Sequence, residues 1–139
     1  MKILILNGPN LNLIGRREPE IYGTMTFDEL LVELRERFPE CEFDLFQTNH
    51  EGVLIDKLQE ADSKYQGVVF NPGGYSHTSI ALADTVRAIA VPVAEVHLSN
   101  IYEREKFRHH SYITEVAKYS IVGKGMQGYC EAVNKLLQK

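Results

Sequence analysis

The sequence predicts an α/β fold in which a doubly wound five-stranded parallel sheet, order 2-1-3-4-5, carries helices on both faces. Short β-branched apolar runs alternate along the chain with amphipathic helical segments, a pattern typical of parallel sheets with right-handed crossovers. The first run, residues 2–7 (KILILN), is apolar almost throughout, as expected of a central strand that is covered on both faces. A chain of 139 residues is long enough for one domain with a hydrophobic core.

The composition narrows the class of protein. Hydrophobic residues make up 44% and charged residues 24%, as in ordinary soluble globular proteins. A net charge of -4 gives no basic footprint for nucleic acid, and the apolar runs are too short for a signal peptide or a membrane span. Cys41 and Cys130 lack metal-type spacing and are interpreted as free thiols in a reducing compartment. We therefore expect a cytoplasmic protein.

The first half of the chain contains one unusually long loop. Residues 10–25 show neither helical nor alternating periodicity, and such loops in compact domains are usually functional, so we expect an active-site lid there. Thr26 and Glu29 have capping-box spacing at the start of an amphipathic helix that Pro39 closes. Residues 41–47 alternate like a half-buried strand, and residues 51–65 have helical spacing.

The second half continues the alternation. Residues 67–71 form the predicted third strand, 72–77 a turn and 78–90 a helix. Residues 93–98 and 120–123 are the fourth and fifth strands, and a last helix covers about 127–137. Five such units fit the flavodoxin-like strand order, so residues 1–139 are expected to form a single flavodoxin-like catalytic domain.

Polar segments follow three strands that this order makes neighbours. Asn10 follows the first strand, residues 71–77 follow the third, and residues 97–108 follow the fourth. Ligands of open α/β sheets bind at the carboxyl ends of the strands, beside the topological switch point. The sequence therefore predicts a site at this edge.

Glu95 and His97 are the first candidates for that site. They are two residues apart on a predicted buried strand, so they share a face. The carboxylate can hold one imidazole nitrogen while the other faces a ligand. A satisfied buried histidine is the alternative, but the polar loops that arrive at the same edge favour catalysis.

Arg104 and Arg108 are four residues apart and would line one side of a helical turn, where they could bind an anionic substrate. Glu103 and Glu105 lie among them, so a solvated surface with weak ion pairs is an equal alternative from spacing alone.

Three further motifs have structural alternatives. Residues 73–79 (GGYSHTS) could form an anion pocket, while Ser76 or Thr78 could simply cap the next helix, and both can hold at once. Asp84 has the spacing to pair with Arg87 on a helix surface. Residues 123–128 match G-x-G-x-x-G, but the chain ends soon afterwards, so close helix–strand packing is preferred to dinucleotide binding. No metal-type cluster accompanies the adjacent His109 and His110.

The predicted lid contains a candidate base. Tyr22 shares this loop with Arg16 and Arg17. A phenol with a pKa of about 10 is roughly 0.1% ionised at neutral pH, equivalent to about 4 kcal/mol. One arginine at about 4 Å, in an effective dielectric near 20, supplies about that much. Arg17, aided by Arg108, could therefore make Tyr22 a usable base, although packing of the lid by Tyr22 is a reasonable alternative.

Together these segments resemble the type II 3-dehydroquinate dehydratase family. The matching stretches span nearly the whole chain in order and are residues 7–13 (NGPNLNL), 15–19 (GRREP), 22–23 (YG), 47–52 (QTNHEG), 71–79 (NPGGYSHTS), 95–100 (EVHLSN), 104–108 (REKFR) and 123–129 (GKGMQGY).

The resemblance implies dehydration of 3-dehydroquinate to 3-dehydroshikimate in the shikimate pathway, by anti elimination through an enolate and without cofactor or metal. By matching position, Tyr22 as phenolate removes the C2 proton, and Arg17 and Arg108 lower its pKa.

The resemblance assigns the remaining roles as well. Asn10, through a bound water, stabilises the enolate oxygen, and His97 held by Glu95 protonates the departing C1 hydroxyl. The substrate hydroxyls and carboxylate are bound by Asn71, His77, Leu98, Ser99 and Arg108.

The resemblance further implies a dodecamer, a tetramer of trimers. The position of Asp84 matches one that reaches the site of a neighbouring subunit, which takes precedence over the surface pair suggested by spacing.

The residues fit this chemistry, and other classes remain as alternatives. Elimination β to a ketone needs a base, a donor for the enolate and an acid for the leaving hydroxide. A Schiff-base route would need a lysine in an apolar pocket, and none has that setting. The alternatives are a flavodoxin-like binding module for a flavin or a phosphoryl group, without catalysis, and a purely structural subunit of an oligomer.

Overall fold

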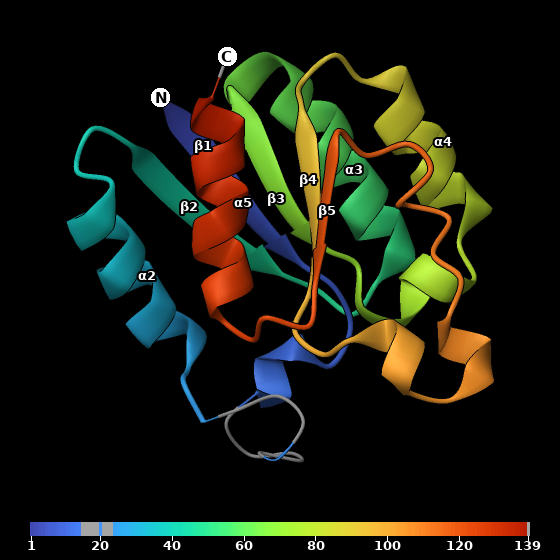
Figure 1. The fold of residues 1–139 in the computed structure, drawn as a ribbon. Helices are drawn as coiled ribbons and strands as arrows, with labels where there is room; N and C mark the ends of the chain where they lie inside the picture. The colour runs from blue at the N-terminus through green and yellow to red at the C-terminus, as the bar shows by residue number, and fades with distance from the viewer. Residues whose placement is uncertain (15–19, 21–23, 139) are drawn as a thin grey trace.

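The computed structural model describes residues 1–14, 20 and 24–138. Five parallel strands form one sheet in the order β2-β1-β3-β4-β5, which confirms the predicted fold class. The strands are β1 (Lys2–Asn7), β2 (Glu42–Gln47), β3 (Gly67–Asn71), β4 (Val93–His97) and β5 (Tyr119–Val122). Their carboxyl ends meet at one edge, at the bottom of Figure 1, while the N-terminus lies at the top.

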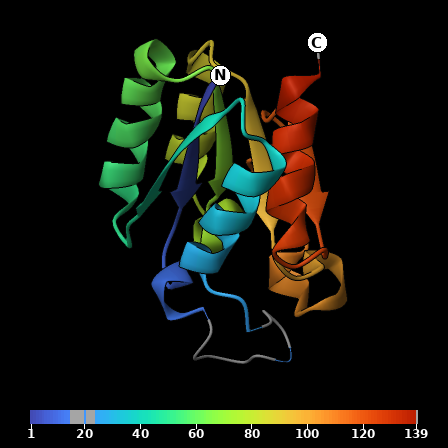
Figure 2. The same ribbon diagram turned by 90° about the vertical axis from the view of Figure 1, so that its left-hand side faces the viewer.

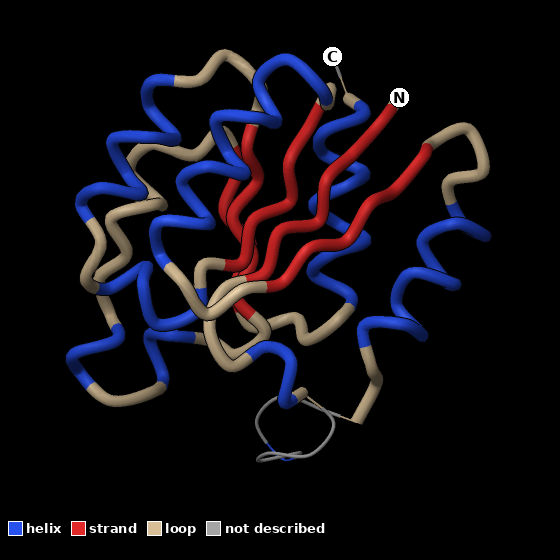
Figure 3. Tube along the Cα trace, turned by 180° about the vertical axis from the view of Figure 1, so that it is seen from behind, coloured by secondary structure: helices blue, strands red, loops and turns tan. Residues whose placement is uncertain are grey.

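Helices cover the sheet on both faces, as Figures 1 and 2 show. On one face lie α2 (Phe27–Arg37) and α5 (Gln127–Leu137), and on the other lie α3 (Glu51–Lys64) and α4 (Ile80–Ala88). Seen from behind in Figure 3, α3 and α4 lie in front of the strands. Each layer encloses its own buried apolar cluster, the first around Ile5 and Val133 and the second around Leu6 and Leu82.

The alternation of side chains along the central strands explains these two clusters. Ile3 and Ile5 of β1 face α2 and α5, whereas Leu4 and Leu6 face α3 and α4, and all four are at most 3% exposed. A strand between two helix layers buries side chains on both faces, which explains the continuous apolar run of residues 3–6. Asn7 continues the first of these faces and brings a buried amide to the edge where the strands end.

Local sequence signals explain where the helices begin. The predicted capping box is present at α2, where the Thr26 hydroxyl accepts from the Glu29 amide at 3.2 Å and the Glu29 carboxylate accepts from the Thr26 amide at 3.1 Å. At α4 the expectation of a Ser76 or Thr78 cap is wrong. Ser79 caps this helix by accepting from the Leu82 amide at 2.9 Å, because residues 73–77 form a separate 3-10 helix before it.

In two loop segments the observed conformation differs from the predicted one. Leu11–Leu13, inside the predicted long loop, form a short 3-10 helix. The single helical turn predicted around Arg104 and Arg108 is wrong: the segment forms two 3-10 helices, Ile101–Glu103 and Lys106–Arg108. Arg104 lies between them with an extended backbone, at φ -102° and ψ -165°, which interrupts the turn. Among the described residues no helix is long and apolar enough to span a membrane.

Candidate active site

A cavity of about 240 Å³ lies at the carboxyl ends of β1, β3 and β4. This is the edge at which the sequence places polar segments, at the switch point of the strand order. The cavity is lined by Pro9, Asn10, Leu11, Ile14, Asn71, Gly73, Gly74, His77, His97, Leu98, Ser99, Ile101, Arg104 and Arg108. It therefore brings together seven of the predicted site residues: Asn10, Asn71, His77, His97, Leu98, Ser99 and Arg108.

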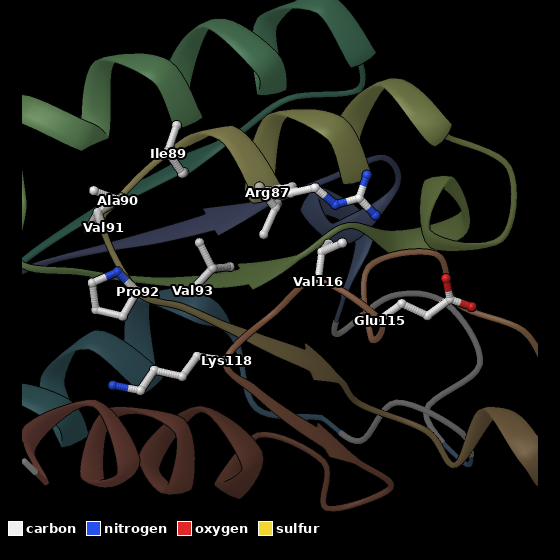
Figure 4. A pocket seen from close by; sticks show the side chains of 10 residues that line it. Arg87, Ile89, Ala90, Val91, Pro92, Val93, Glu115, Val116 and Lys118 are labelled. Atoms are coloured by element: carbon white, nitrogen blue, oxygen red, sulfur yellow. The ribbon is translucent and has the colours of Figure 1, made fainter.

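A more open hollow, of about 510 Å³, lies at the start of β4, and Figure 4 shows it. Ile89, Val91 and Pro92 line it together with the charged side chains of Arg87 and Lys118. It occupies the amino end of this strand, whereas the predicted site residues gather at the carboxyl end. Because ligands of open α/β sheets bind at the carboxyl ends, the smaller cavity is the candidate active site.

Glu95 and His97 form the buried dyad that their spacing predicts. The His97 Nε2 atom is 2.8 Å from the Glu95 Oε2 atom, and the two side chains are 6% and 0% exposed. Burial raises the Glu95 pKa, but hydrogen bonds from His97, Ser111 and Thr114, together with the charge of His97, outweigh it and hold the pKa at about 2. A carboxylate can only accept, so Nε2 carries the proton and Nδ1 is left for a ligand.

His77 lies beside the dyad with a ring orientation that the backbone fixes. Its Nδ1 is 2.7 Å from the His110 carbonyl oxygen and donates to it, and its ring stacks against His97 at 6.2 Å between centroids. Burial lowers the His77 pKa, and the charges of His97 and Arg108 lower it further against the effect of the His110 carbonyl. A neutral His77 presents Nε2 as an acceptor, which suits a hydroxyl group of a ligand.

Asn71 is oriented from beneath by a fully buried phenol. Its side-chain Nδ2 donates to the Tyr129 hydroxyl at 3.0 Å, and its Oδ1 accepts from the Gly73 amide at 3.1 Å. The Tyr129 hydroxyl in turn donates to the Asn7 Oδ1 at 2.7 Å. Desolvation raises the pKa of this phenol, so Tyr129 is neutral and can donate.

The turn after β1 places Asn10 at the cavity in a left-handed conformation, with φ 69°. The Asn10 amide donates to the Asn49 Oδ1 at 3.0 Å, and Gln47 donates both to that oxygen and to the Gly8 carbonyl at 3.1 Å. Asparagine tolerates this backbone region better than most residues. The end of β2 therefore holds the turn, and the Asn10 side chain is left at the cavity.

Two arginines among the lining residues, Arg104 and Arg108, bring positive charge to the cavity. Arg108 donates from Nε to the Glu105 carboxylate at 2.5 Å, and Arg104 lies 3.5 Å from the Ser99 hydroxyl. Their side chains are 28% and 17% exposed, so neither belongs to a fully solvated surface. The interpretation as cationic groups near a ligand is therefore favoured over a solvated face.

One predicted site residue lies elsewhere, and two fall outside the residues that the structure describes. Asp84 does not line the cavity: it is on α4, 65% exposed, with its Oδ1 3.6 Å from Arg87 in the i,i+3 pair that the spacing suggests. Tyr22 and Arg17 lie outside the described residues.

The groups that hold the dyad and Asn71 are not among the residues predicted from the sequence. Ser111, Thr114 and Ser120 all donate to Glu95, and Tyr129 orients Asn71. Only the contact of Ser120 with Glu95 could have been predicted, because the two residues are neighbours in the β4–β5 register. The other contacts join segments with no periodicity in common.

The arrangement supports acid–base chemistry on a polar anion. An imidazole with a fixed tautomer can donate or accept a proton, an amide and a neutral imidazole can bind hydroxyl groups, and two guanidinium groups can bind a carboxylate. Among the described residues no cluster of three or more His, Cys, Asp or Glu side chains could hold a metal ion.

Comparison with known proteins gives this site a context. The family model described as dehydroquinase class II matches residues 1–137. A 3-dehydroquinate dehydratase of Bacillus licheniformis is 53% identical over 135 residues, which cover 95% of this chain and 92% of that protein. A crystal structure of the type II dehydroquinase from Butyrivibrio crossotus has a TM-score of 0.93 at 44% identity, covering 98% of this chain and 97% of that one.

A second solved structure is as similar to this chain as the first. The type II dehydroquinase from Propionibacterium acnes has a TM-score of 0.93 at 41% identity and covers 99% of this chain and 97% of its own. The resemblance seen in the motifs is thus confirmed over almost the full length. The chain belongs to the class II dehydroquinase family.

Proposed function

We propose that this chain is an enzyme that dehydrates 3-dehydroquinate to 3-dehydroshikimate, a hydro-lyase of the shikimate pathway. Membership of the class II dehydroquinase family supports this reaction and does not favour the flavodoxin-like binding module. The observation that carries it within the molecule is the buried Glu95–His97 dyad, 2.8 Å apart, at a cavity that Asn71, His77 and Arg108 also line.

The proposed elimination begins at C2 of the substrate. A base removes the C2 proton, and the electrons move into an enolate whose oxygen needs a donor. We assign the base to Tyr22 as phenolate, with Arg17 and Arg108 lowering its pKa, and the enolate donor to a water held by Asn10. Support for the last role is the position of Asn10 at the cavity, held by Asn49 and the turn after β1.

The reaction ends with loss of the C1 hydroxyl. In its doubly protonated form, with one proton on each ring nitrogen, His97 gives the Nδ1 proton to this leaving group, while Nε2 stays hydrogen-bonded to Glu95. The proton and the hydroxyl leave from opposite faces, and the products are water and a conjugated enone carboxylate. Neither a cofactor nor a metal takes part in this scheme, because every proton moves between the substrate and a side chain.

The remaining lining residues bind the substrate in this proposal. Asn71 and His77 face hydroxyl groups, the first through its amide and the second through its neutral Nε2. Leu98 and Ser99 offer backbone groups, with the Ser99 hydroxyl in addition, and Arg108 binds the carboxylate. Residues 10–25 then act as the lid of one catalytic domain, 1–139, and exclusion of water would strengthen each of these interactions.

Assembly and location belong to the same proposal. We expect a homododecamer, a tetramer of trimers, in which Asp84 reaches the site of a neighbouring subunit. Its 65% exposure on α4 leaves it available for such a contact. Mass photometry of the purified protein tests the assembly: a species of twelve subunits is expected, and a monomer alone would contradict it. The proposed location is the cytoplasm.

An ultraviolet assay tests the function. The conjugated product absorbs and the substrate does not, so formation of 3-dehydroshikimate is followed directly, with the wild type beside Tyr22→Phe and both checked by circular dichroism. We expect wild-type turnover that falls by at least about 10²-fold in the folded variant. Turnover that survives would keep the reaction and remove the tyrosinate base, and no turnover by folded wild type would overturn the proposed function.

A further inference from the structure

The Glu95 carboxylate, although fully buried, is surrounded by four hydrogen-bond donors. Oε2 accepts from His97 Nε2 at 2.8 Å and from the Ser111 hydroxyl at 2.5 Å. Oε1 accepts from the Thr114 hydroxyl at 2.5 Å and from the Ser120 hydroxyl at 2.7 Å. A carboxylate has about four acceptor positions, so all of them are occupied.

The direction of the Ser111 hydrogen bond is fixed by the backbone. The Ser111 hydroxyl oxygen accepts from the Ile113 amide at 3.2 Å and from the Thr114 amide at 3.3 Å. Both lone pairs of this oxygen are therefore engaged, and its single proton is left for Glu95. Ser111 is 4% exposed, so exchange of this partner for water is restricted.

These contacts oppose protonation of Glu95. A proton on either carboxyl oxygen would have to displace one of the donors, and displacement on Oε2 would leave the hydroxyl of Ser111 or the ring nitrogen of His97 buried without this partner. Within the part of the chain that the structure describes, the titratable group hydrogen-bonded to the carboxylate is His97, and His77 stacks against that ring at 6.2 Å between centroids. The proton shared within the dyad therefore stays on Nε2 of His97.

We propose that Ser111, Thr114 and Ser120 are positioning residues for the dehydration: their hydroxyls form a cage that keeps Glu95 a carboxylate and thereby fixes the tautomer and orientation of His97. The three residues lie behind the dyad, in residues 111–114 and in β5, and none of them lines the cavity. They act through Glu95 and not on the substrate. The segment that carries Ser111 and Thr114 is also bound to residues 73–77, because the Tyr112 amide donates to the Ser76 carbonyl at 2.8 Å.

The variants that test the cage remove hydroxyls with little change in shape. Thr114→Val and Ser120→Ala, alone and combined, remove the hydroxyl donors to Glu95 Oε1 and leave the His97 contact on Oε2. Ser111→Ala is less suitable, because it also deprives two backbone amides of their acceptor. Thr85→Val is the matched control, since this threonine is 8% exposed and its hydroxyl donates to the Ala81 carbonyl at 2.9 Å, within α4.

The kinetic result expected is a loss in kcat without a loss in substrate binding. The double variant should have a kcat about tenfold below that of the Thr85→Val control, with KM within about twofold. A rise in KM at unchanged kcat would contradict the cage, and so would a kcat equal to that of the control.

A spectroscopic measurement separates positioning from structural support. The carboxyl carbon of Glu95, labelled with ¹³C and assigned by its absence in Glu95→Gln, is titrated in substrate-free protein. In the double variant it should titrate about one pH unit higher, or more, than in the wild type and in Thr85→Val. An unchanged titration would overturn the proposal even if kcat had fallen. Only the kinetic part rests on the proposed function. A wild type without turnover would overturn that function, while the titration would still show whether the hydroxyls keep Glu95 ionised.

Discussion

The Tyr129 hydroxyl donates a hydrogen bond to the Asn7 side-chain oxygen at 2.7 Å, although the two residues are 122 positions apart. It also accepts from Asn71, so one phenol of α5 joins the ends of the two central strands, β1 and β3. The Asn7 Nδ2 is buried and has no partner among the described residues. One hydroxyl group thus connects two buried asparagine side chains at the edge where the cavity lies.

Removal of that hydroxyl should weaken both folding and substrate binding. Tyr129→Phe leaves the Asn7 oxygen and the Asn71 amide buried without a partner, at a cost of about 1–3 kcal/mol for each group. We expect a loss of about 2–6 kcal/mol in the free energy of unfolding, measured by urea denaturation, and a rise in KM because Asn71 loses one of the two hydrogen bonds that orient it. Tyr119→Phe, on the edge strand, is the control, and equal stability of the two variants would contradict this role.

Gly8 should not tolerate a side chain, because the turn after β1 approaches the backbone after β3. A Cβ atom at Gly8 would lie 2.5 Å from the Pro72 carbonyl oxygen, and backbone on both sides restricts relaxation. Gly8→Ala should destabilise the protein by about 2–4 kcal/mol and reduce turnover, since the turn leads to Asn10.

Gly52 offers the matched control for that variant. It lies in the first turn of α3, and a Cβ atom added there would meet nothing within 4 Å, so Gly52→Ala should stabilise by about 0.5–1 kcal/mol. Thermal unfolding of both variants decides the matter. Similar melting temperatures for the two variants would show that the close approach of Gly8 to Pro72 does not affect the stability of the protein.

Glu95 should make the stability of the protein depend on pH in the acid range. Its folded pKa of about 2 lies below the ordinary value of 4.5, so its contribution is complete above pH 4.5 and is lost as the pH falls towards 2. The stability advantage of wild type over Glu95→Gln should therefore shrink by roughly 3 kcal/mol between pH 5 and pH 2. Urea denaturation across this range measures it, and a difference that does not vary with pH would argue against a buried ionised carboxylate.

Asp84 should matter for activity more than for stability. Its pair with Arg87 is exposed at both side chains, and such pairs contribute about 0–1 kcal/mol. Asp84→Asn should unfold within about 0.5 kcal/mol of wild type, yet lose kcat/KM by about tenfold if this carboxylate reaches a neighbouring site. Arg87→Gln removes the same surface pair and serves as the control. Full activity of the oligomeric Asp84→Asn protein would refute the intersubunit role.

The alternation of elements could be predicted because it rests on local patterns. Residues 2–7 and 93–97 are apolar enough to mark buried strands, and the period of two then places Glu95 and His97 on one face. The helix start at Thr26 follows from two side chains three residues apart. Strand order then decides which loops meet.

Contacts between distant segments with no shared period could not be predicted. Thr114 reaches Glu95 from an irregular segment, and Tyr129 reaches Asn7 across almost the whole chain. The break at Arg104 was missed because the i,i+4 spacing of the arginines says nothing about the extended backbone between them. Such details depend on tertiary packing, which a pattern of hydrophobicity does not encode.

The face of the substrate from which the C2 proton leaves offers the most direct test of the proposed reaction. Two samples of 3-dehydroquinate, each with deuterium at one of the two C2 positions, are converted by the wild type, and the mass of the 3-dehydroshikimate is measured. We predict turnover in which the deuterium on the face opposite the C1 hydroxyl is lost and the deuterium on the same face is retained. Loss of the deuterium on the same face, or no product from folded protein, would contradict anti elimination by this site.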